Sequence, residues 1–394
     1  MPNSPQSLLG GMTQREFLRA HWQRKPLLVR GALPASFAPL SPEELAGLAM
    51  EAEVASRLVL LPRGSRRWDV RYGPFQEEDF AALPETEWTL LVQEVDQWHP
   101  AAAGLLDSFR FIPNWRIDDV MVSYAVAGGG VGAHIDNYDV FLVQSAGRRR
   151  WRISSRPLTE ERLVQDIDVR VLADFEPDEE WILEPGDMLY LPPRIAHEGV
   201  ALEPCMTFSI GFRAPSAGDM LPSFVHHVAD MLEEDERFVD AGRLPADKPG
   251  LIEDEALERL HDMIVSPLKD SRHFRSWFGQ YVTEPKRSRY PEPIEEPFDP
   301  EEILAMLEDG IPLHRTSVAH FAHIVHDDGS ISLFVGGQEY PLPDDLTFAA
   351  HLLDGPGVLT RAVIGSHAAN AGFMHLLTQI VNSGFLIPYS EEND

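Results

Sequence analysis

The sequence contains a single cysteine, Cys205, among its 394 residues. One cysteine excludes any disulfide within the chain, which suits a reducing compartment. No stretch of about 18 consecutive apolar residues occurs, so we expect no membrane-spanning helix. The first residues lack a basic start followed by an apolar run, and we therefore expect no signal peptide. Together these absences predict a cytoplasmic protein.

Basic residues are also scarce, with 33 Lys and Arg against 63 Asp and Glu and a net charge of -30. Phosphate binding needs Lys and Arg to displace counterions, so this balance argues against general affinity for nucleic acid. It disfavours anionic membrane surfaces in the same way. An acidic protein can attract a basic partner, although such a charge also simply keeps a protein in solution.

The length predicts two or three domains. The N-terminal part of the chain, up to residue 60, predicts both helices and strands. Thr13 and Glu16 have the spacing of a capping box, which predicts a helix after Thr13. Residues 26–30 read as a short strand, and residues 41–60 look helical. From 68 to 213, short apolar runs alternate with Gly and Pro, a pattern typical of a β-sandwich or barrel.

The pattern changes near Pro215. Residues 221–242 have the apolar spacing of an amphipathic helix, and residues 251–283 predict one or two more. Residues 290–300, rich in Pro and acid, read as a linker. Beyond the linker we expect a small mixed domain, with a hairpin that turns at an Asp-Asp-Gly sequence between helical segments.

The sharpest local feature is the sequence GGGVGAHIDNYDVFLVQ, which contains His134 and Asp136. On an extended strand, residues two apart project from the same face, so an imidazole and a carboxylate can converge on one ion. Because a His-x-Asp pair occurs by chance in many chains, this pair alone is a weak signal.

The sequence WILEPGDMLYLPPRIAHEGVAL supplies a third ligand, His197, after a Pro-Gly-Asp turn and an apolar strand. This layout is typical of a double-stranded β-helix. Two histidines and one carboxylate leave three positions open on an ion, as in the facial triad of non-haem Fe(II) oxygenases. The open positions can take a 2-oxo acid and then O2. The pattern therefore predicts a catalytic metal site at His134, Asp136 and His197.

The co-substrate of such an enzyme, 2-oxoglutarate, needs a cation for its far carboxylate. Residues 147–152 (GRRRWR) turn into a predicted strand. Alternation puts Arg149 and Trp151 on one face and Arg148 and Arg150 on the other. A guanidinium suits a carboxylate because the two can form paired hydrogen bonds. An arginine run is often only a solvated strand end, but beside the triad we expect Arg149 to point inward.

Residues 115–154, together with EPGDMLYLPPRIAHEGVAL and FSIGFRAP, resemble the Jumonji-C ribosomal oxygenases and, among them, the bacterial YcfD-like arginine hydroxylases. The opening FLRAHWQRKPLLVRGAL resembles the same family. The resemblance implies an α+β multidomain chain. Its parts would be a Jumonji-C double-stranded β-helix (cupin) domain at 1–215, a helical dimerisation region at 216–290 and a winged-helix-like domain at 291–394.

On the family's pattern, the iron ligands fall at His134, Asp136 and His197, and the 2-oxoglutarate carboxylate falls at Arg149. The implied cofactors are Fe(II), 2-oxoglutarate and O2. Bacterial members hydroxylate an arginine in large-subunit ribosomal protein L-sixteen, whereas human relatives hydroxylate histidines in other ribosomal proteins. The implied partners are therefore a basic ribosomal protein and a second copy of the chain.

An arginine substrate carries a positive charge, so we expect a carboxylate near the iron to bind it. Asp118 and Asp119 are the candidates, and alternation along a regular strand lets only one face inward. The resemblance favours Asp118 as the substrate-binding residue, although the pair could merely open a strand at a turn. Tyr138 and Met121 could form apolar walls, and Ser209 could contact the co-substrate.

Other histidines raise the hypothesis of a second metal site. Adjacent histidines on a helix point in different directions, and the remaining ones have no cysteine nearby, so we expect structural or surface roles for all of them. They are His226, His227, His261, His314, His320, His323 and His326. After Pro297 the only basic residues are Arg315 and Arg361, so we expect the last domain to contact protein rather than DNA.

Three hypotheses follow. The leading one is an Fe(II)- and 2-oxoglutarate-dependent hydroxylase of a ribosomal protein arginine, with a histidyl hydroxylase as its variant. A methyl-lysine demethylase of the same fold would need an aromatic cage, which the sequence does not single out. A non-catalytic ribosome-assembly scaffold is opposed by the intact set of ligands. The sequence does not distinguish Fe from Mn, Co or Ni, because affinity alone favours other ions.

Overall fold

The computed structural model describes residues 8–62, 68–232, 237–285, 290–291, 294–355 and 357–389. The chain divides into two compact units, Met1–Ala214 and Pro215–Asp394. Among the described residues, no helix combines the length and the apolar character that crossing a bilayer requires.

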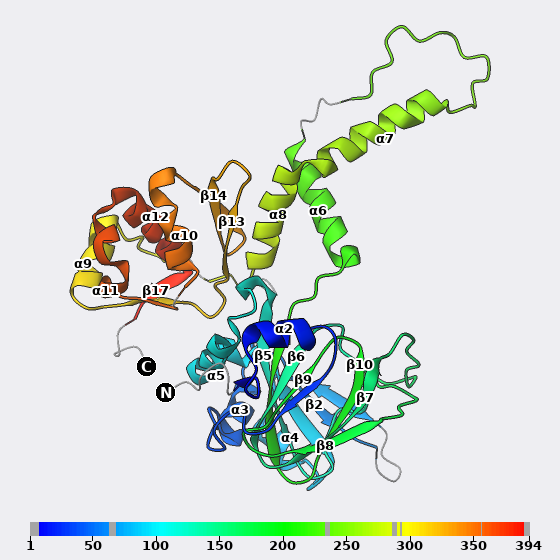
Figure 1. Ribbon diagram of the computed structural model, residues 1–394, viewed down its shortest axis with the longest axis vertical. Helices are drawn as coiled ribbons and strands as arrows, with labels where there is room; N and C mark the ends of the chain where they lie inside the picture. Colours follow the sequence, from blue (N-terminus) through cyan, green and yellow to red (C-terminus); the bar gives the residue numbers. More distant parts are fainter. Residues whose placement is uncertain are drawn as a thin grey trace. The chain divides into compact units, whose positions relative to one another are not determined.

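The first unit is built on two antiparallel sheets (Figure 1). The larger sheet has the strand order β1-β9-β6-β11-β5-β4-β2-β3, and the smaller has the order β10-β7-β8. A cluster of buried apolar side chains from β6, β7, β8 and β9 joins the two sheets. The strands are β1 (Leu27–Val29), β2 (Ser56–Leu60), β3 (Asp69–Tyr72), β4 (Trp88–Val92), β5 (Ile117–Ala125), β6 (Val140–Ala146), β7 (Arg149–Pro157), β8 (Glu179–Leu183), β9 (Met188–Leu191), β10 (Ile195–Ala201) and β11 (Cys205–Phe212).

Short helices cover the outer face of the larger sheet. α2 (Gln14–Ala20) begins at the predicted capping box, in which Thr13 Oγ1 accepts a hydrogen bond from the Glu16 backbone N–H. It buries Phe17 against Phe141 and Tyr190, with ring centroids 5.6 and 5.0 Å away. The other helices of this unit are α3 (Pro42–Leu48), α4 (Glu77–Ala81), α5 (Pro100–Leu105) and the 3-10 turns η1 (Val95–Gln97), η2 (Leu106–Phe109) and η3 (Asn114–Arg116).

Two helix predictions were too long. The helix expected over 41–60 ends at Leu48, and β2 follows at Ser56, because the apolar run after it pairs with β3 and β4. The helix expected over 221–242 ends at Met231, residues 233–236 lie outside the described residues, and residues 237–242 are not helical. In both cases apolar spacing that fits a helix was taken past the residue where the helix ends.

The second unit contains three helices followed by a small mixed fold. The helices are α6 (Ala217–Met231), α7 (Asp254–Lys269) and α8 (Ser271–Thr283). The predicted hairpin is present, because β13 (Phe321–Val325) pairs with β14 (Ile331–Val335) around the Asp-Asp-Gly turn. The remaining elements are α9 (Pro300–Glu308), β12 (Leu313–Arg315), β15 (Gln338–Leu342), η5 (Asp344–Leu346), α10 (Phe348–Leu353), β16 (Val358–Leu359), α11 (Arg361–Ile364), η6 (Gly365–Ala369), α12 (Ala371–Asn382) and β17 (Leu386–Pro388).

Helix α8 packs directly on the hairpin sheet. Gly279 makes this possible, because a Cβ there would lie 2.4 Å from the Phe334 ring. Thr283 Oγ1 also accepts a hydrogen bond from the Gly337 backbone N–H at 3.2 Å. α8 therefore belongs to the same packed unit as the strands that follow it.

Candidate active site

His134 and His197 face each other across an isolated antiparallel bridge. His134 N donates to His197 O at 3.0 Å, and His197 N donates to His134 O at 2.9 Å. Directly opposed residues present their side chains on the same face, so the two imidazoles project together, with ring centroids 4.2 Å apart. The regular strand predicted around His134 was wrong: within the described residues His134 forms only this bridge, and β6 begins at Val140.

Asp136 completes a cluster of three potential ligands. Its Oδ2 atom lies 3.6 Å from His197 Nε2. One donor atom from each of the three side chains lies within 4.8 Å of the others. Two imidazoles and one carboxylate are the donor set that non-haem Fe(II) takes. The residues that the sequence singled out are therefore brought together, and they fit a divalent metal ion.

Backbone carbonyls determine which imidazole nitrogens are available. His134 Nδ1 lies 3.0 Å from Gly132 O, and His197 Nδ1 lies 2.9 Å from Ile195 O. Since a carbonyl can only accept, each Nδ1 carries the hydrogen and each Nε2 keeps a lone pair for a metal. Burial, followed by the neighbouring His134, lowers the pKa of His197 to about 4. The imidazole of His197 is therefore neutral at physiological pH, which is the form that can bind a metal ion.

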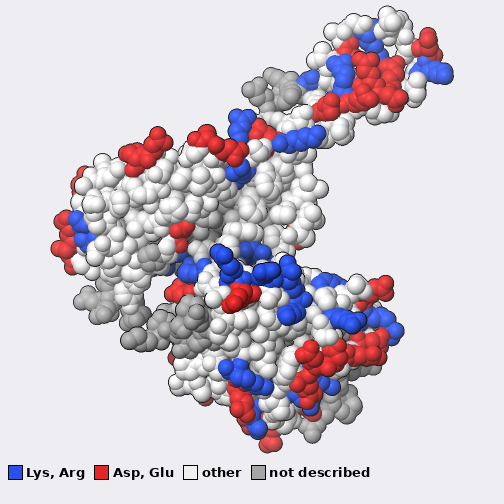
Figure 2. Space-filling model, in the orientation of Figure 1, with Lys and Arg blue, Asp and Glu red and all other residues white. Residues whose placement is uncertain are grey.

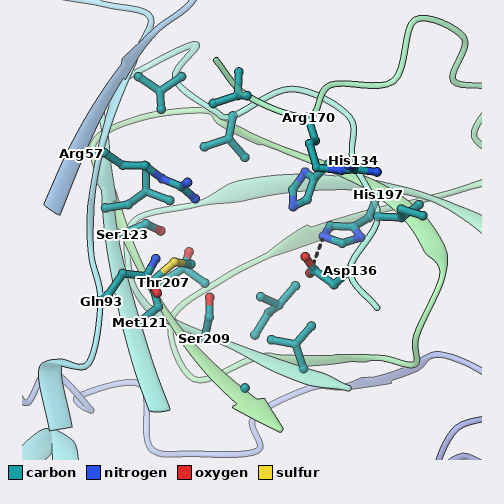
Figure 3. A pocket seen from close by; sticks show the side chains of 18 of the residues that line it. Arg57, Gln93, Met121, Ser123, His134, Asp136, Arg170, His197, Thr207 and Ser209 are labelled. Carbon is teal, nitrogen blue, oxygen red and sulfur yellow. Dashed lines mark ion pairs between the residues drawn. The ribbon is translucent and has the colours of Figure 1, made fainter. Parts of the chain in front are cut away.

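A cavity of about 330 Å³ lies beside the triad (Figure 3). The larger sheet lines one wall through β2, β4, β5, β6 and β11, and the smaller sheet lines the other through β7 and β10. A volume of this size suits a small acid and one side chain of a second substrate. The side chains labelled in Figure 3 are Arg57, Gln93, Met121, Ser123, His134, Asp136, Arg170, His197, Thr207 and Ser209.

Arg149 lies in the wall of this cavity and is 3% exposed. Its Nη1 donates to Ser123 Oγ at 3.1 Å and to Thr207 Oγ1 at 3.4 Å. No carboxylate among the described residues pairs with it, and its Nε has no hydrogen-bond partner. Burial lowers the pKa of its guanidinium. A buried cation without a counter-ion is costly, so the site fits a small anion such as a carboxylate.

The predicted alternation along β7 is confirmed. Arg149, Trp151 and Ile153 are buried, whereas Arg150 and Arg152 are only half-buried. The guanidinium of Arg149 lies 5.1 Å from the centroid of the Trp151 ring.

Arg57 is a cavity residue that the sequence did not indicate, because it lies in a stretch read as helix. In the structure it is on β2 and points into the cavity (Figure 3). A single cross-strand row joins Arg57 to Leu91, Leu91 to Ser123, and Ser123 to Thr207. Strands lie about 4.8 Å apart, so Arg57 starts about 10 Å from the Ser123 backbone, within reach of an extended arginine. Its Nε is buried without a hydrogen-bond partner.

Asp118 and Asp119 sit in a β-bulge rather than in a regular strand. Ile210 pairs with Val120 and Phe212 pairs with Ile117, so the two acids together oppose Gly211. A Cβ on Gly211 would lie 3.3 Å from Asp119 Oδ1 and 3.9 Å from Asp118 Cβ. Both acids therefore lie beside the same residue, but only Asp119 lines the cavity, so one of the two faces inward as expected.

The two acids differ in their contacts. Asp119 lines the cavity, and its Oδ2 accepts a hydrogen bond from the Glu94 backbone N–H at 3.2 Å. Asp118, which the sequence favoured, is 34% exposed and accepts a hydrogen bond from Arg213 Nε at 3.2 Å. Tyr138, Met121 and Ser209 also line the cavity. Burial, followed by the charges of Asp136 and Asp119, raises the pKa of Tyr138.

Known proteins resemble this chain over nearly its whole length. A family model for the JmjC domain matches residues 104–220, and a family model for the ROXA-like winged helix matches residues 261–387. The chain is 37% identical to the ribosomal protein uL16 3-hydroxylase of Escherichia coli (strain K12), over 94% of this chain and 96% of that protein. It is 36% identical to a probable ribosomal oxygenase of Haemophilus influenzae, over 76% of this chain and 75% of that protein.

Solved structures of ribosomal oxygenases have the same fold as this chain. The structure of the E. coli ribosomal oxygenase YcfD has a TM-score of 0.83 and 35% identity, covering 96% of this chain and 98% of that one. The complex of YcfD with cobalt and 2-oxoglutarate also has a TM-score of 0.83, covering 96% of this chain and 99% of that one. These matches bear out a cupin core with a C-terminal winged-helix domain. The chain therefore belongs to the JmjC ribosomal oxygenases, and it is a homologue of a 2-oxoglutarate-dependent hydroxylase over nearly its whole length.

Proposed function

We propose that this chain hydroxylates an arginine side chain of the large-subunit ribosomal protein uL16, using Fe(II) and 2-oxoglutarate in the cytoplasm. The observation that carries the proposal is one cavity that contains the cluster of His134, Asp136 and His197 together with the buried cation of Arg149. The uL16 substrate is the one named for the E. coli relative.

The triad would hold the metal through His134 Nε2, His197 Nε2 and a carboxylate oxygen of Asp136. When bound, Fe(II) supplies the redox chemistry by which O2 and 2-oxoglutarate become succinate, CO2 and one hydroxyl group on the substrate. The protein's own contribution is placement: the bridge between His134 and His197 aims both imidazoles, and the carbonyls of Gly132 and Ile195 fix their tautomers. The apolar part of the cavity wall, which includes Val140, Leu142 and Trp151, would limit the access of water.

Arg149 would bind the far carboxylate of 2-oxoglutarate, with Ser123 and Thr207 beside it. Their hydroxyls already lie within hydrogen-bond reach of its Nη1. Arg57 would provide a second positive charge for the same carboxylate, because it lies in the same cross-strand row as Ser123 and Thr207. Two cations facing one end of the acid would leave its keto end directed at the metal.

The acids of the bulge would receive the substrate guanidinium. Asp118 is our candidate, and Asp119 lies over the same glycine and lines the cavity. A guanidinium can bind two carboxylate oxygens at once, so a bulge that places two acids together suits an arginine better than a neutral histidine. Met121 and Tyr138 would flank the aliphatic part of the side chain.

Replacing either acid with asparagine is expected to weaken binding of the substrate. Loss of a charge-assisted hydrogen bond costs about 1.5–3 kcal/mol, so KM for an arginine peptide from uL16 should rise roughly 10- to 150-fold. The measurement is steady-state kinetics of Asp118→Asn and Asp119→Asn, with Glu203→Gln, an exposed acid paired with Arg148, as the control. Unchanged peptide KM in both variants would contradict the role of the bulge.

The proposed activity is tested by mass spectrometry of uL16 incubated with the protein, Fe(II) and 2-oxoglutarate. We expect a mass gain of one oxygen atom, located on an arginine by fragmentation. No gain, or a gain that persists in His134→Ala, would sink the proposal. A mass gain on a histidine instead would confirm the proposed hydroxylation but contradict arginine as its target.

We also propose the three-part division into residues 1–215, 216–290 and 291–394, in which α8 of the middle part packs on the hairpin of the last part and the middle part forms a homodimer. The support comes from α7, which has no buried residue. Its Leu257, Leu260 and Ile264 share one helix face and are 50%, 38% and 66% exposed. An apolar stripe of this kind calls for a partner surface, and a second copy of the chain presents the same stripe.

Light scattering of the full chain at micromolar concentration should give twice the mass of one chain. Leu257→Glu with Ile264→Glu should give the mass of one chain, because both charges would enter the apolar contact. Glu258→Gln, a substitution within the same helix, is the control. A wild-type protein that is monomeric would overturn the dimer.

The last part would contact protein rather than nucleic acid. On the face shown in Figure 2, Lys and Arg are sparse over the region of α9, α10, α11 and α12. The sequence beyond Pro297 contains Arg315 and Arg361 as its only Lys or Arg residues. A basic ribosomal protein is a better electrostatic match for such a surface than phosphate groups are.

A further inference from the structure

A second group of metal-ligating side chains lies in the winged-helix unit, separate from the catalytic triad. His323 comes from β13, His351 from α10, and Asp354 caps the C-terminus of α10. One donor atom from each lies within 4.8 Å of the others. Elements that are far apart along the chain thus bring two imidazoles and one carboxylate together.

The local structure explains the convergence. His351 and Asp354 are three residues apart, so helical geometry puts both on one side of α10. β13 packs against α10, and His323, opposite Leu333 in the hairpin, projects toward that side. His323 Nδ1 lies 2.7 Å from Asp354 Oδ2, and the rings of His323 and His351 are edge to face with centroids 4.8 Å apart.

An ion pair between His323 and Asp354 explains why these two side chains lie together, but it does not explain the position of His351. The hydrogen bond to Asp354 raises the pKa of His323. The side chain of His351 has no hydrogen bond or ion pair with any residue that the structure describes, and its ring contacts the ring of His323. The side chains of His323 and Asp354 are 20% and 25% exposed, and His351 is exposed, so an ion could enter from solvent.

We propose that His323, His351 and Asp354 form a second metal site, which takes Zn2+ or a similar divalent transition ion. Two imidazoles select such ions over Mg2+ and Ca2+, which prefer oxygen ligands. Ligands about 2.0–2.2 Å from zinc lie about 3.3 Å from one another. His323 Nδ1 and Asp354 Oδ2, now 2.7 Å apart, must therefore separate slightly, and the exposed His351 must turn toward them. Binding of the ion releases to solvent the proton that His323 shares with Asp354, and a water molecule takes the fourth position.

The site would tie α10 to β13 and act on the stability of the winged-helix unit, not on the reaction. Arg315 also reaches this end of α10, where its Nη2 donates to Leu353 O at 2.5 Å. Its positive charge opposes a cation, so an ion held only by electrostatic attraction, such as Mg2+, should not bind here. The sequence pointed to His323 among neighbours at hairpin spacing. His351 and Asp354 escaped notice because only the packing of α10 brings them near.

Zinc binding to the full chain tests the site, after stripping with a chelator, by calorimetry and by metal analysis after dialysis. His134→Ala serves as the background, since it removes a candidate ligand of the catalytic triad. Adding His351→Ala should remove one further equivalent of zinc, whereas adding His375→Ala, an exposed histidine on α12, should remove none. Zinc should also raise the Tm of the background variant by more than that of His134→Ala with His351→Ala. Equal zinc content in these two proteins would overturn the proposal.

Discussion

Replacing His197 with alanine is expected to abolish tight metal binding at the triad and to lower hydroxylation of uL16 by more than about 100-fold, since losing even an outer-shell partner of a metal ligand costs about 10- to 100-fold. The His197 side chain is 2% exposed, and its Nδ1 hydrogen is donated to Ile195 O. Its Nε2 atom is therefore directed at the other two members of the triad. Mn(II) binding and mass spectrometry of the product would measure the two effects.

The effect of His197→Ala on folding must be distinguished from its effect on metal binding. His197→Ala removes a buried side chain, so its unfolding curve should be recorded beside that of His226→Ala, an exposed histidine of α6. The two variants should both keep a cooperative transition, while only His197→Ala loses Mn(II) binding. A His197→Ala protein that folds and still binds Mn(II) as tightly as wild type would exclude this residue from the metal site.

Local pattern was enough to predict the triad, because the weak signal of the His-x-Asp pair is joined by the Pro-Gly-Asp turn and apolar strand before His197. The His-x-Asp pair and the Pro-Gly-Asp turn before His197 were recognisable in the sequence, and the structure brings all three side chains together. The inward Arg149 followed from two-residue alternation, which holds because β7 is regular at that point. These predictions needed only local geometry and one long-range pairing.

Features that depend on exact register or on tertiary packing were harder to predict from the sequence. The bulge opposite Gly211 leaves Asp119, rather than the favoured Asp118, in the cavity lining, and no residue type in the sequence indicates a bulge there. Arg57 was hidden because the apolar residues around it fit helical spacing as well as a strand. His351 became a candidate ligand only through the packing of α10 on β13. Tertiary contacts, rather than local propensity, decide each of these.

Arg149 should show opposite effects on stability and on binding. Arg149→Met replaces the cation with an apolar side chain of similar length. Removing a buried charge without a counter-ion should leave the ligand-free protein as stable as wild type or more stable by up to about 2 kcal/mol. The same change should raise the Kd for 2-oxoglutarate by roughly 30- to 4000-fold, because the far carboxylate would lose a charge partner worth about 2–5 kcal/mol.

Thermal unfolding with and without 2-oxoglutarate, in the presence of Mn(II), measures both effects in one experiment. 2-Oxoglutarate should raise the Tm of wild type but not that of Arg149→Met, since a ligand stabilises only in proportion to its binding. Arg148→Met is the matched control: the next residue along the chain, it points away from the cavity, is 48% exposed and pairs with Glu203. Arg57→Met should fall between the two, because Arg149 would still hold the carboxylate. If Arg149→Met binds 2-oxoglutarate like wild type, the buried cation serves something other than this co-substrate.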